Sequence, residues 1–215
     1  DSYADGKLDG YHLNYYGCVT ALDRAVGKLR TRLRDHGIAD NTLVAFCSDN
    51  GPEGNDKAPG RQGQFKGRKR SLYEGGVRVP GLLEWPAKIK PGTSSNVATC
   101  TVDYFPTILD IVGVDMPDDR PLDGVSLVPL LEGSMETRPR PLGFHIRGHA
   151  AWHNGDWKAY CSKVNSSDWE LYNLKDDPGE SNNQAATEST KLETMIAAWK
   201  QWKASVEASD KGGDY

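Results

Sequence analysis

Two polar residues directly after an apolar segment are the first candidates for chemistry in this sequence. Asp49 and Asn50 follow the apolar residues 42–47, with Ser48 before them and Gly51 after them. A carboxylate beside an amide oxygen offers two hard oxygen donors, which suit Ca²⁺ or Mg²⁺ and suit zinc poorly. Asp-Asn-Gly is also common in turns, so the motif alone leaves a purely structural role open.

A basic, glycine-rich segment follows at residues 57–70. It contains no acidic residue and six basic ones, although the chain carries a formal net charge of −4: Lys57, Arg61, Lys66, Arg68, Lys69 and Arg70. A positive loop beside the end of a strand suits a small anion such as phosphate or sulfate, and glycines let the backbone approach it closely. A solvated basic loop without a ligand is the alternative.

The next segment, Tyr-Glu-Gly-Gly-Val-Arg-Val-Pro at residues 73–80, leads from this loop to another apolar stretch. Gly75 and Gly76 allow positive φ, and Glu74 and Arg78 are spaced to pair across a turn. On spacing alone, a structural role is favoured here.

Three histidines recur at intervals of four residues, at His145, His149 and His153. This spacing aligns side chains on a helix but not on a strand, and the region has the pattern of strands. A metal cluster is therefore not expected, and the roles of the three histidines stay open.

Composition narrows the class of protein. The chain has 215 residues, of which 37% are hydrophobic and 26% charged, enough for a folded core. Its acidic balance argues against nucleic-acid binding, and its longest apolar run, residues 43–47, is far too short to span a membrane. The four cysteines form no Cys-x-x-Cys pair, and their disulfide pairing is left undecided.

The first half of the chain has the pattern of an α/β unit. Apolar residues spaced by three and four predict a helix over residues 19–33, which Gly37 should end. The continuously apolar residues 42–47 predict a strand buried on both faces, as in a largely parallel sheet. A second strand is expected at residues 80–85.

Farther along, Asp103 is expected to cap a helix over residues 104–112, with Gly113 past its end. Residues 134–141 have the composition of a linker. Four short aromatic segments then predict a small antiparallel sheet, at residues 142–146, 151–152, 157–161 and 169–174. An amphipathic helix should follow from about residue 192 to 206. We therefore expect two parts, residues 1–135 and 136–215.

Several of these segments together resemble the second half of type I sulfatases of the arylsulfatase and N-acetylgalactosamine-6-sulfatase type, from the alkaline-phosphatase-like superfamily. The matching segments are residues 21–27, 43–51, 66–80, 103–114, 122–127, 155–158, 170–174 and 177–180. The resemblance implies a carboxy-terminal portion of an α/β sandwich with a mostly parallel sheet. A small antiparallel sheet and a C-terminal helix would follow.

Residue by residue, the resemblance implies that Asp49 and Asn50 are two ligands of a divalent cation, Ca²⁺ or alternatively Mg²⁺. It places the active-site lysine, which contacts the sulfate, at Lys69, four residues before Tyr73. The family's nucleophile is a formylglycine made in a Cys-x-Pro-x-Arg motif, and none of the four cysteines lies in such a motif. We therefore expect the nucleophile outside this chain and the 215 residues to be inactive alone.

The implied parent enzyme hydrolyses the sulfate ester of a carbohydrate or aryl compound. The resemblance to this family also suggests a periplasmic or secreted protein. A phosphatase or phosphonate monoester hydrolase of the same superfamily is one alternative. A non-catalytic carbohydrate- or anion-binding module, using the aromatic residues of segment 142–174, is another. Unpaired sheet edges in such a portion would favour a homodimer.

Overall fold

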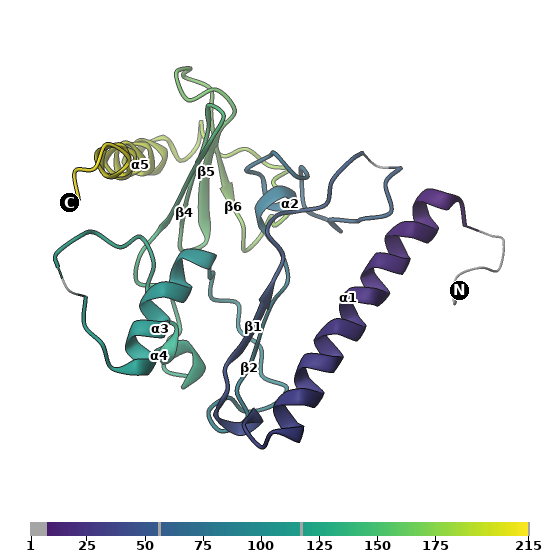
Figure 1. The fold of residues 1–215 in the computed structure, drawn as a ribbon. Helices are drawn as coiled ribbons and strands as arrows, with labels where there is room; N and C mark the ends of the chain where they lie inside the picture. The colour runs from purple at the N-terminus through teal and green to yellow at the C-terminus, as the bar shows by residue number, and fades with distance from the viewer. Residues whose placement is uncertain (1–7, 56, 117, 215) are drawn as a thin grey trace.

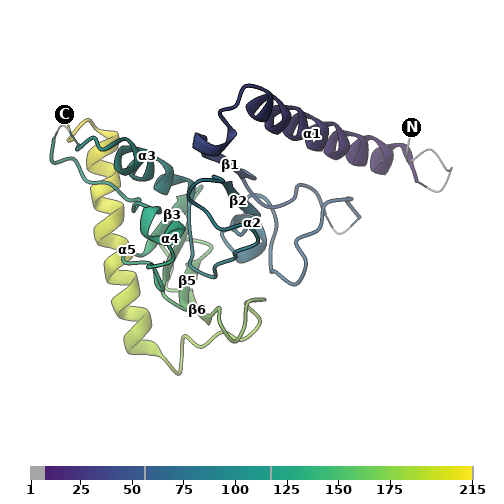
Figure 2. The same cartoon turned by 90° about the horizontal axis from the view of Figure 1, so that it is seen from below.

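The computed structural model describes residues 8–55, 57–116 and 118–214. Figure 1 shows the long helix α1 on one side and a sheet covered by helix α5 on the other, with the strands β1 and β2 between them. The view from below in Figure 2 shows the same order, with α1 on one side and α5 on the other. The described strands form two antiparallel sheets, one of two strands and one of four.

Helix α1 (Gly10–Asp35) begins nine residues earlier than predicted. The side chain of Asp9 caps it by accepting a 2.9 Å hydrogen bond from the amide of His12. Gly37 ends the helix, as predicted, with φ of 67° and a 2.9 Å bond from its amide to the carbonyl of Arg34. The left-handed conformation explains why glycine is favoured at this position.

Strands β1 (Val44–Cys47) and β2 (Gly81–Glu84) pair antiparallel, with Cys47 opposite Gly81. The expectation that the first strand is buried on both faces was wrong, because none of its residues is buried by the part of the chain that the structure describes. Only two strands form this sheet among the described residues, so much of the apolar surface of β1 has no neighbour. β1 was expected to lie beside a parallel strand, whereas its partner β2 runs antiparallel to it.

The helix predicted at residues 104–112 is confirmed as α3 (Tyr104–Val112), and Gly113 follows it with φ of 67°. Asp103 occupies the N-cap position of α3, as predicted, but its side chain makes no capping hydrogen bond there. Its fully buried carboxylate instead accepts two 2.7 Å hydrogen bonds from Arg138. This bidentate ion pair anchors the supposed linker, at Arg138, onto the fold. The short helices η1 (Ala39–Asn41), α2 (Glu74–Val77), η2 (Thr101–Asp103) and α4 (Val128–Leu131) complete this half.

The predicted antiparallel sheet is confirmed, with its strands in sequence order: β3 (Leu142–Ile146), β4 (His149–Asn154), β5 (Trp157–Cys161) and β6 (Trp169–Asn173). Helix α5 (Ser189–Asp210) packs across it. The main core lies between them and comprises Ala150, Trp152, Ala159, Cys161, Trp169, Leu171, Met195 and Trp199. Four of the six Phe, Tyr and Trp side chains of residues 142–174 are buried, which leaves only the half-buried Phe144 and Trp157 for the carbohydrate-binding surface of the alternative hypothesis.

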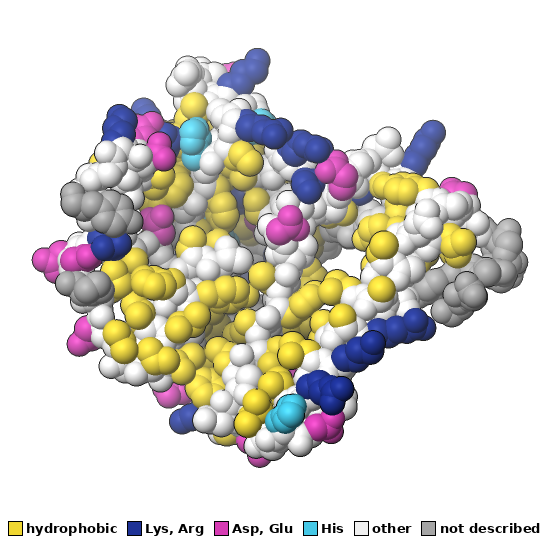
Figure 3. All heavy atoms as spheres, in the orientation of Figure 1, with side chains coloured by type: hydrophobic (Ala, Val, Ile, Leu, Met, Phe, Trp, Pro, Cys, Tyr) yellow, Lys and Arg dark blue, Asp and Glu magenta, His cyan; other side chains and the backbone are white. Residues whose placement is uncertain are grey.

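A large apolar surface remains exposed on the other half of the molecule. Figure 3 shows hydrophobic side chains gathered over α3, the β1–β2 pair and the facing side of α1. The exposed residues there include Val19, Leu22, Leu29, Leu82, Phe105, Ile108 and Val112. Among the described residues, no helix is both long and apolar enough to cross a lipid bilayer.

Candidate functional site

The end of β1 presents Asp49 and Asn50 at the molecular surface. Asp49 is exposed and Asn50 is half-buried. The side-chain amide nitrogen of Asn50 donates a 2.9 Å hydrogen bond to the carbonyl of Gly51. The Asp49 carboxylate and the Asn50 amide oxygen are the two groups that could bind a cation here. Both are hard donors that suit Ca²⁺ or Mg²⁺, but two ligands are far fewer than the six to eight that Ca²⁺ takes.

Close backbone contacts fasten this strand end to α2. The amide of Gly51 donates a 2.9 Å hydrogen bond to the carbonyl of Gly76. A Cβ atom on Gly51 would lie 1.9 Å from the carbonyl oxygen of Gly75, and one on Gly76 would lie 2.0 Å from that of Ser71. Gly75 and Gly76 do not have positive φ, which corrects the sequence-based reason for them. The glycines are needed because the backbones approach too closely for any side chain.

Lys69 lies in the loop beside the same strand end. Its amide donates a 3.1 Å hydrogen bond to the carbonyl of Pro52, and its Nζ lies 3.8 Å from Oε2 of Glu53. Arg70 binds the other oxygen of Glu53 at 2.6 Å. This hydrogen bond is the main cause that holds the pKa of Glu53 below its usual value. The structure thus ties Lys69 to residues two and three positions beyond Asn50.

Most other cations of the predicted basic loop bind protein groups at shorter range. Arg68 donates to the carbonyls of Glu53 and Gly60 at 3.0 and 2.8 Å. Lys66 donates to the hydroxyl of Tyr172 at 3.2 Å. These cations hold the loop in shape, whereas the ammonium of Lys69 makes, among the described residues, only the long contact with Glu53. Lys69 is therefore the cation of this segment best placed to exchange its partner for an incoming anion.

A buried group of charges behind α2 was not predicted from the sequence. Lys158 on β5 is 1% exposed, and its Nζ donates a 2.8 Å hydrogen bond to Oε1 of Glu74. The same ammonium lies 3.0 Å from Oε1 of Glu180, as an ion pair rather than a directed hydrogen bond. Burial raises the pKa of Glu180. The only sequence signals were a lysine among apolar strand residues and a glutamate after a Pro-Gly turn.

A second polar group lies beside it. Oε2 of Glu170 accepts hydrogen bonds from the hydroxyls of Tyr73 and Tyr172, at 2.6 and 2.7 Å. Nζ of Lys66 lies 4.0 Å from the centre of the Tyr73 ring, a cation–π contact. Burial, and then the hydrogen bond to Glu170, raise the pKa of both tyrosines. The two phenols therefore act as neutral donors.

The three histidines have separate surroundings. The ring of His145 lies 5.9 Å from that of Trp199, and Nδ1 of His149 lies 3.1 Å from the hydroxyl of Tyr160. Burial lowers the pKa of His153. Among the described residues, no group of three or more His, Cys, Asp or Glu side chains is arranged to hold a metal ion.

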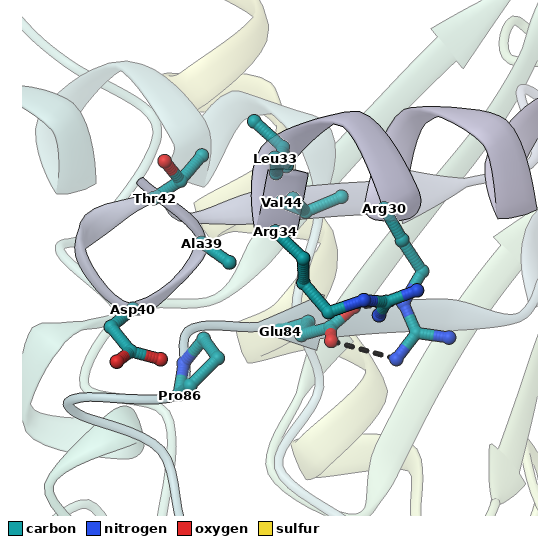
Figure 4. A pocket seen from close by; sticks show the side chains of 9 residues that line it. All are labelled: Arg30, Leu33, Arg34, Ala39, Asp40, Thr42, Val44, Glu84 and Pro86. Atoms are coloured by element: carbon teal, nitrogen blue, oxygen red, sulfur yellow. Dashed lines mark hydrogen bonds and ion pairs between the residues drawn. The ribbon is translucent and has the colours of Figure 1, made fainter. Parts of the chain in front are cut away.

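Two cavities lie away from Asp49, Asn50 and Lys69. The smaller, of about 100 Å³, lies between α1 and the β1–β2 pair (Figure 4). Arg30 there donates two hydrogen bonds to Glu84, at 2.6 and 2.8 Å, so its charge is already paired. The larger, of about 600 Å³, lies between α2 and the four-stranded sheet and has a mixed lining of acidic, basic and apolar groups.

Comparisons with known proteins agree on one family. Residues 1–114 match the family model described as sulfatase, and residues 60–204 match that described as N-sulphoglucosamine sulphohydrolase, C-terminal. The steryl-sulfatase of Mus musculus is 36% identical over an alignment of 172 residues, and the match covers 74% of this chain and 28% of that protein. The N-acetylglucosamine-6-O-sulfatase of Bacteroides thetaiotaomicron is 32% identical over 82% of this chain and 32% of its own length. The chain therefore spans about a third or less of these curated relatives.

Solved structures give the same result. The structure of Ps i-CgsB in complex with k-i-k-neocarrahexaose has a TM-score of 0.82 at 30% identity, over 94% of this chain and 45% of that one. A second structure, in complex with its substrate D-glucosamine-2-N,6-O-disulfate, has a TM-score of 0.70 at 26% identity, over 97% and 45%. These similarities confirm the predicted α/β fold class, with its antiparallel sheet and C-terminal helix.

Proposed function

Since the chain belongs to the sulfatase family, we propose that it supplies the sulfate-binding and cation-binding side chains of a sulfuric ester hydrolase. The substrate class is a sulfated carbohydrate or a sulfated small molecule, as the names of the relatives suggest. The observation that carries this proposal is the position of Lys69, whose amide is bonded to Pro52 two residues beyond Asn50.

In this proposal each side chain has one task. The ammonium of Lys69 leaves Glu53 and binds a sulfate oxygen, where its charge offsets the negative charge that develops on the leaving oxygen. Asp49 and Asn50 supply two oxygen ligands to a divalent cation, Ca²⁺ or Mg²⁺. A cation held by these two residues would supply Lewis-acid polarisation of the sulfate ester.

The nucleophile is assigned to residues outside this chain. None of its cysteines lies in a Cys-x-Pro-x-Arg motif, the sequence in which sulfatases form their formylglycine. We therefore expect the 215 residues alone to bind sulfate and divalent cations weakly and to hydrolyse no aryl sulfate. For the enzyme to which they contribute, a periplasmic or secreted location is proposed from membership of the sulfatase family alone.

A sulfate titration followed by NMR tests the proposal. Lys69→Ala should weaken sulfate binding at least about tenfold, because a hydrogen bond to a charged group contributes about 1.5–3 kcal/mol. Lys69→Arg should retain part of the affinity, and Lys200→Ala, a change of an exposed lysine on α5, should leave it unchanged. Equal affinity of the Lys69→Ala variant and the original chain would refute the assignment. A marked preference for phosphate over sulfate would favour the phosphatase alternative.

A further inference from the structure

The segment that carries Lys69 is a closed loop. The amide of Gly75 donates a 2.7 Å hydrogen bond to the carbonyl of Lys66, which joins the two ends of residues 66–75. We call these residues the Lys69 loop. Within the loop, the amide of Ser71 bonds to the carbonyl of Arg68 at 3.0 Å. The position of Lys69 therefore depends on where the two joined ends of the loop are held.

We propose that Glu170 and Lys158, both on the four-stranded sheet, are positioning residues for Lys69. They hold the joined ends of the Lys69 loop and thereby place the lysine against Pro52 and Glu53, in the segment that follows Asp49 and Asn50. This inference deepens the proposed function and rests on it, since it assumes that Lys69 binds the sulfate.

Glu170 holds the loop through Tyr73. A single oxygen of its carboxylate accepts the hydroxyls of Tyr73 at 2.6 Å and Tyr172 at 2.7 Å. The ring of Tyr73 also lies against that of Tyr160, with 3.9 Å between their centres. Lys66, at the other end of the loop, lies over the Tyr73 ring and 4.0 Å from Oε2 of Glu170. Both ends of the loop therefore contact the same carboxylate or its tyrosine partner.

Lys158 holds Glu74, the residue that follows Tyr73 in the sequence. It binds Glu74, whose own amide donates a 2.6 Å hydrogen bond to Oε2 of Glu180. Arg78 lies 3.8 Å from the second oxygen of Glu74, so two cations balance two carboxylates. The side chains of Lys158, Glu180 and Glu74 are 1%, 0% and 8% exposed, so these three charges are largely removed from solvent, whereas that of Arg78 is 50% exposed.

The burial of these charges argues for a positional role. Removing charges from water is costly, and a buried ion pair often contributes no more stability than well-packed apolar residues of similar volume. Breaking such a pair is nevertheless strongly destabilising, because it leaves a buried charge without its partner, and in some proteins this requirement specifies the geometry. Here the partners lie 84 residues apart for Lys158 and Glu74 and 97 residues apart for Tyr73 and Glu170. The pairs therefore fix the register between the Lys69 loop and the sheet.

Substitution of Glu170 tests the inference, since its side chain is 31% exposed and its loss should leave the chain folded. Glu170→Ala should weaken sulfate binding about three- to tenfold and speed hydrogen exchange at amides 67–72. Glu170→Gln should restore most of both properties, because its amide oxygen can accept the same two hydroxyls. Glu193→Ala, a change of an exposed glutamate on α5, is the matched control and should alter neither. Lys158→Met should act in the same direction as Glu170→Ala.

The outcomes separate the two proposals. If Glu170→Ala lowers the melting temperature but changes neither sulfate affinity nor exchange of the Lys69 loop, the residue only stabilises the fold and the inference is wrong. If Lys69→Ala leaves sulfate affinity unchanged, the proposed function fails, while the exchange measurement still decides whether Glu170 orders the loop. Should Glu170→Ala not fold, Tyr73→Phe decides instead, since it removes the hydroxyl and keeps the ring.

Discussion

The amide of Gly51 donates a 2.9 Å hydrogen bond to the carbonyl of Gly76. This contact joins the end of β1, which carries Asp49 and Asn50, to the segment directly after the Lys69 loop. Two groups of candidate site residues that are distant in the sequence thus share one rigid junction. Its closeness requires glycine, since a Cβ on Gly51 would lie 1.9 Å from the carbonyl oxygen of Gly75.

The first prediction concerns this junction. Gly51→Ala should lower the free energy of unfolding by about 3 kcal/mol, the upper part of the range for inserting a methyl group into a tightly packed site. Gly27→Ala is the control, because nothing lies within 4 Å of a Cβ at that helical position. It should raise the free energy of unfolding by about 0.5–1 kcal/mol. Urea denaturation measures both, and equal effects would contradict the close contact.

The second prediction concerns Glu53, the carboxylate beside Lys69. Glu53→Gln removes the negative charge that an incoming anion must replace, so sulfate affinity should rise about two- to fivefold at low salt. Because the pKa of Glu53 is lowered, this carboxylate stays ionised at mildly acidic pH in the original chain. The gain in sulfate affinity of Glu53→Gln should therefore persist there. Glu132→Gln, at another exposed site, is the control for net charge. Sulfate titrations in low and high salt provide the measurement; unchanged or weaker binding would count against the exchange of partners at Lys69.

The third prediction concerns pH. Burial lowers the pKa of His153 in the folded chain below its usual value of 6.5, so the fold favours the neutral ring. The stability that this gives is complete above about pH 6.5 and is lost as the pH falls through the lowered pKa. Denaturant unfolding between pH 7.5 and 5 should therefore show a decline that His153→Gln reduces. His36→Gln, at the exposed end of α1, should leave the decline unchanged, and identical profiles for His153→Gln and the original chain would contradict the account.

The fourth prediction concerns the exposed apolar surface. Phe105 and Ile108 on α3 and Leu82 on β2 are 51%, 54% and 64% exposed, and among the described residues no further strand pairs with the β1–β2 sheet. Such a surface should drive self-association of the chain. Sedimentation velocity should show a mass that rises with concentration, and Ile108→Glu should suppress the rise more than Ile146→Glu, at an exposed position on β3. A concentration-independent monomer would exclude the predicted homodimer.

Local patterns predicted much of this fold. The spacing of apolar residues and the glycines after them located α3 and the end of α1, and turn residues separated the strands of the second sheet. These features depend on residues close together in the sequence. The burial of β1 could not be predicted in this way, because it depends on which other strands lie beside it.

In the candidate site, too, features that depend on local sequence could be predicted, and features that depend on contacts between distant segments could not. Asp49, Asn50 and Lys69 could be selected because their motifs are contiguous in the sequence. The buried group of Glu74, Lys158 and Glu180 could not, because its members come from three segments and each has an ordinary local sequence. Asp103 is a further case. Its position predicted a helix cap, but a bidentate bond to Arg138, 35 residues away, competed successfully for its carboxylate.

One measurement tests most directly whether Lys69 shares a site with Asp49 and Asn50. Mn²⁺ binds the same kind of oxygen ligands as Ca²⁺ and Mg²⁺ and broadens nearby NMR signals with a steep dependence on distance. The account predicts that low concentrations of Mn²⁺ broaden the signals of Asn50 and of the Lys69 side chain together, and that Asp49→Ala abolishes both effects. Broadening centred elsewhere in the chain, or at Asn50 without Lys69, would contradict it.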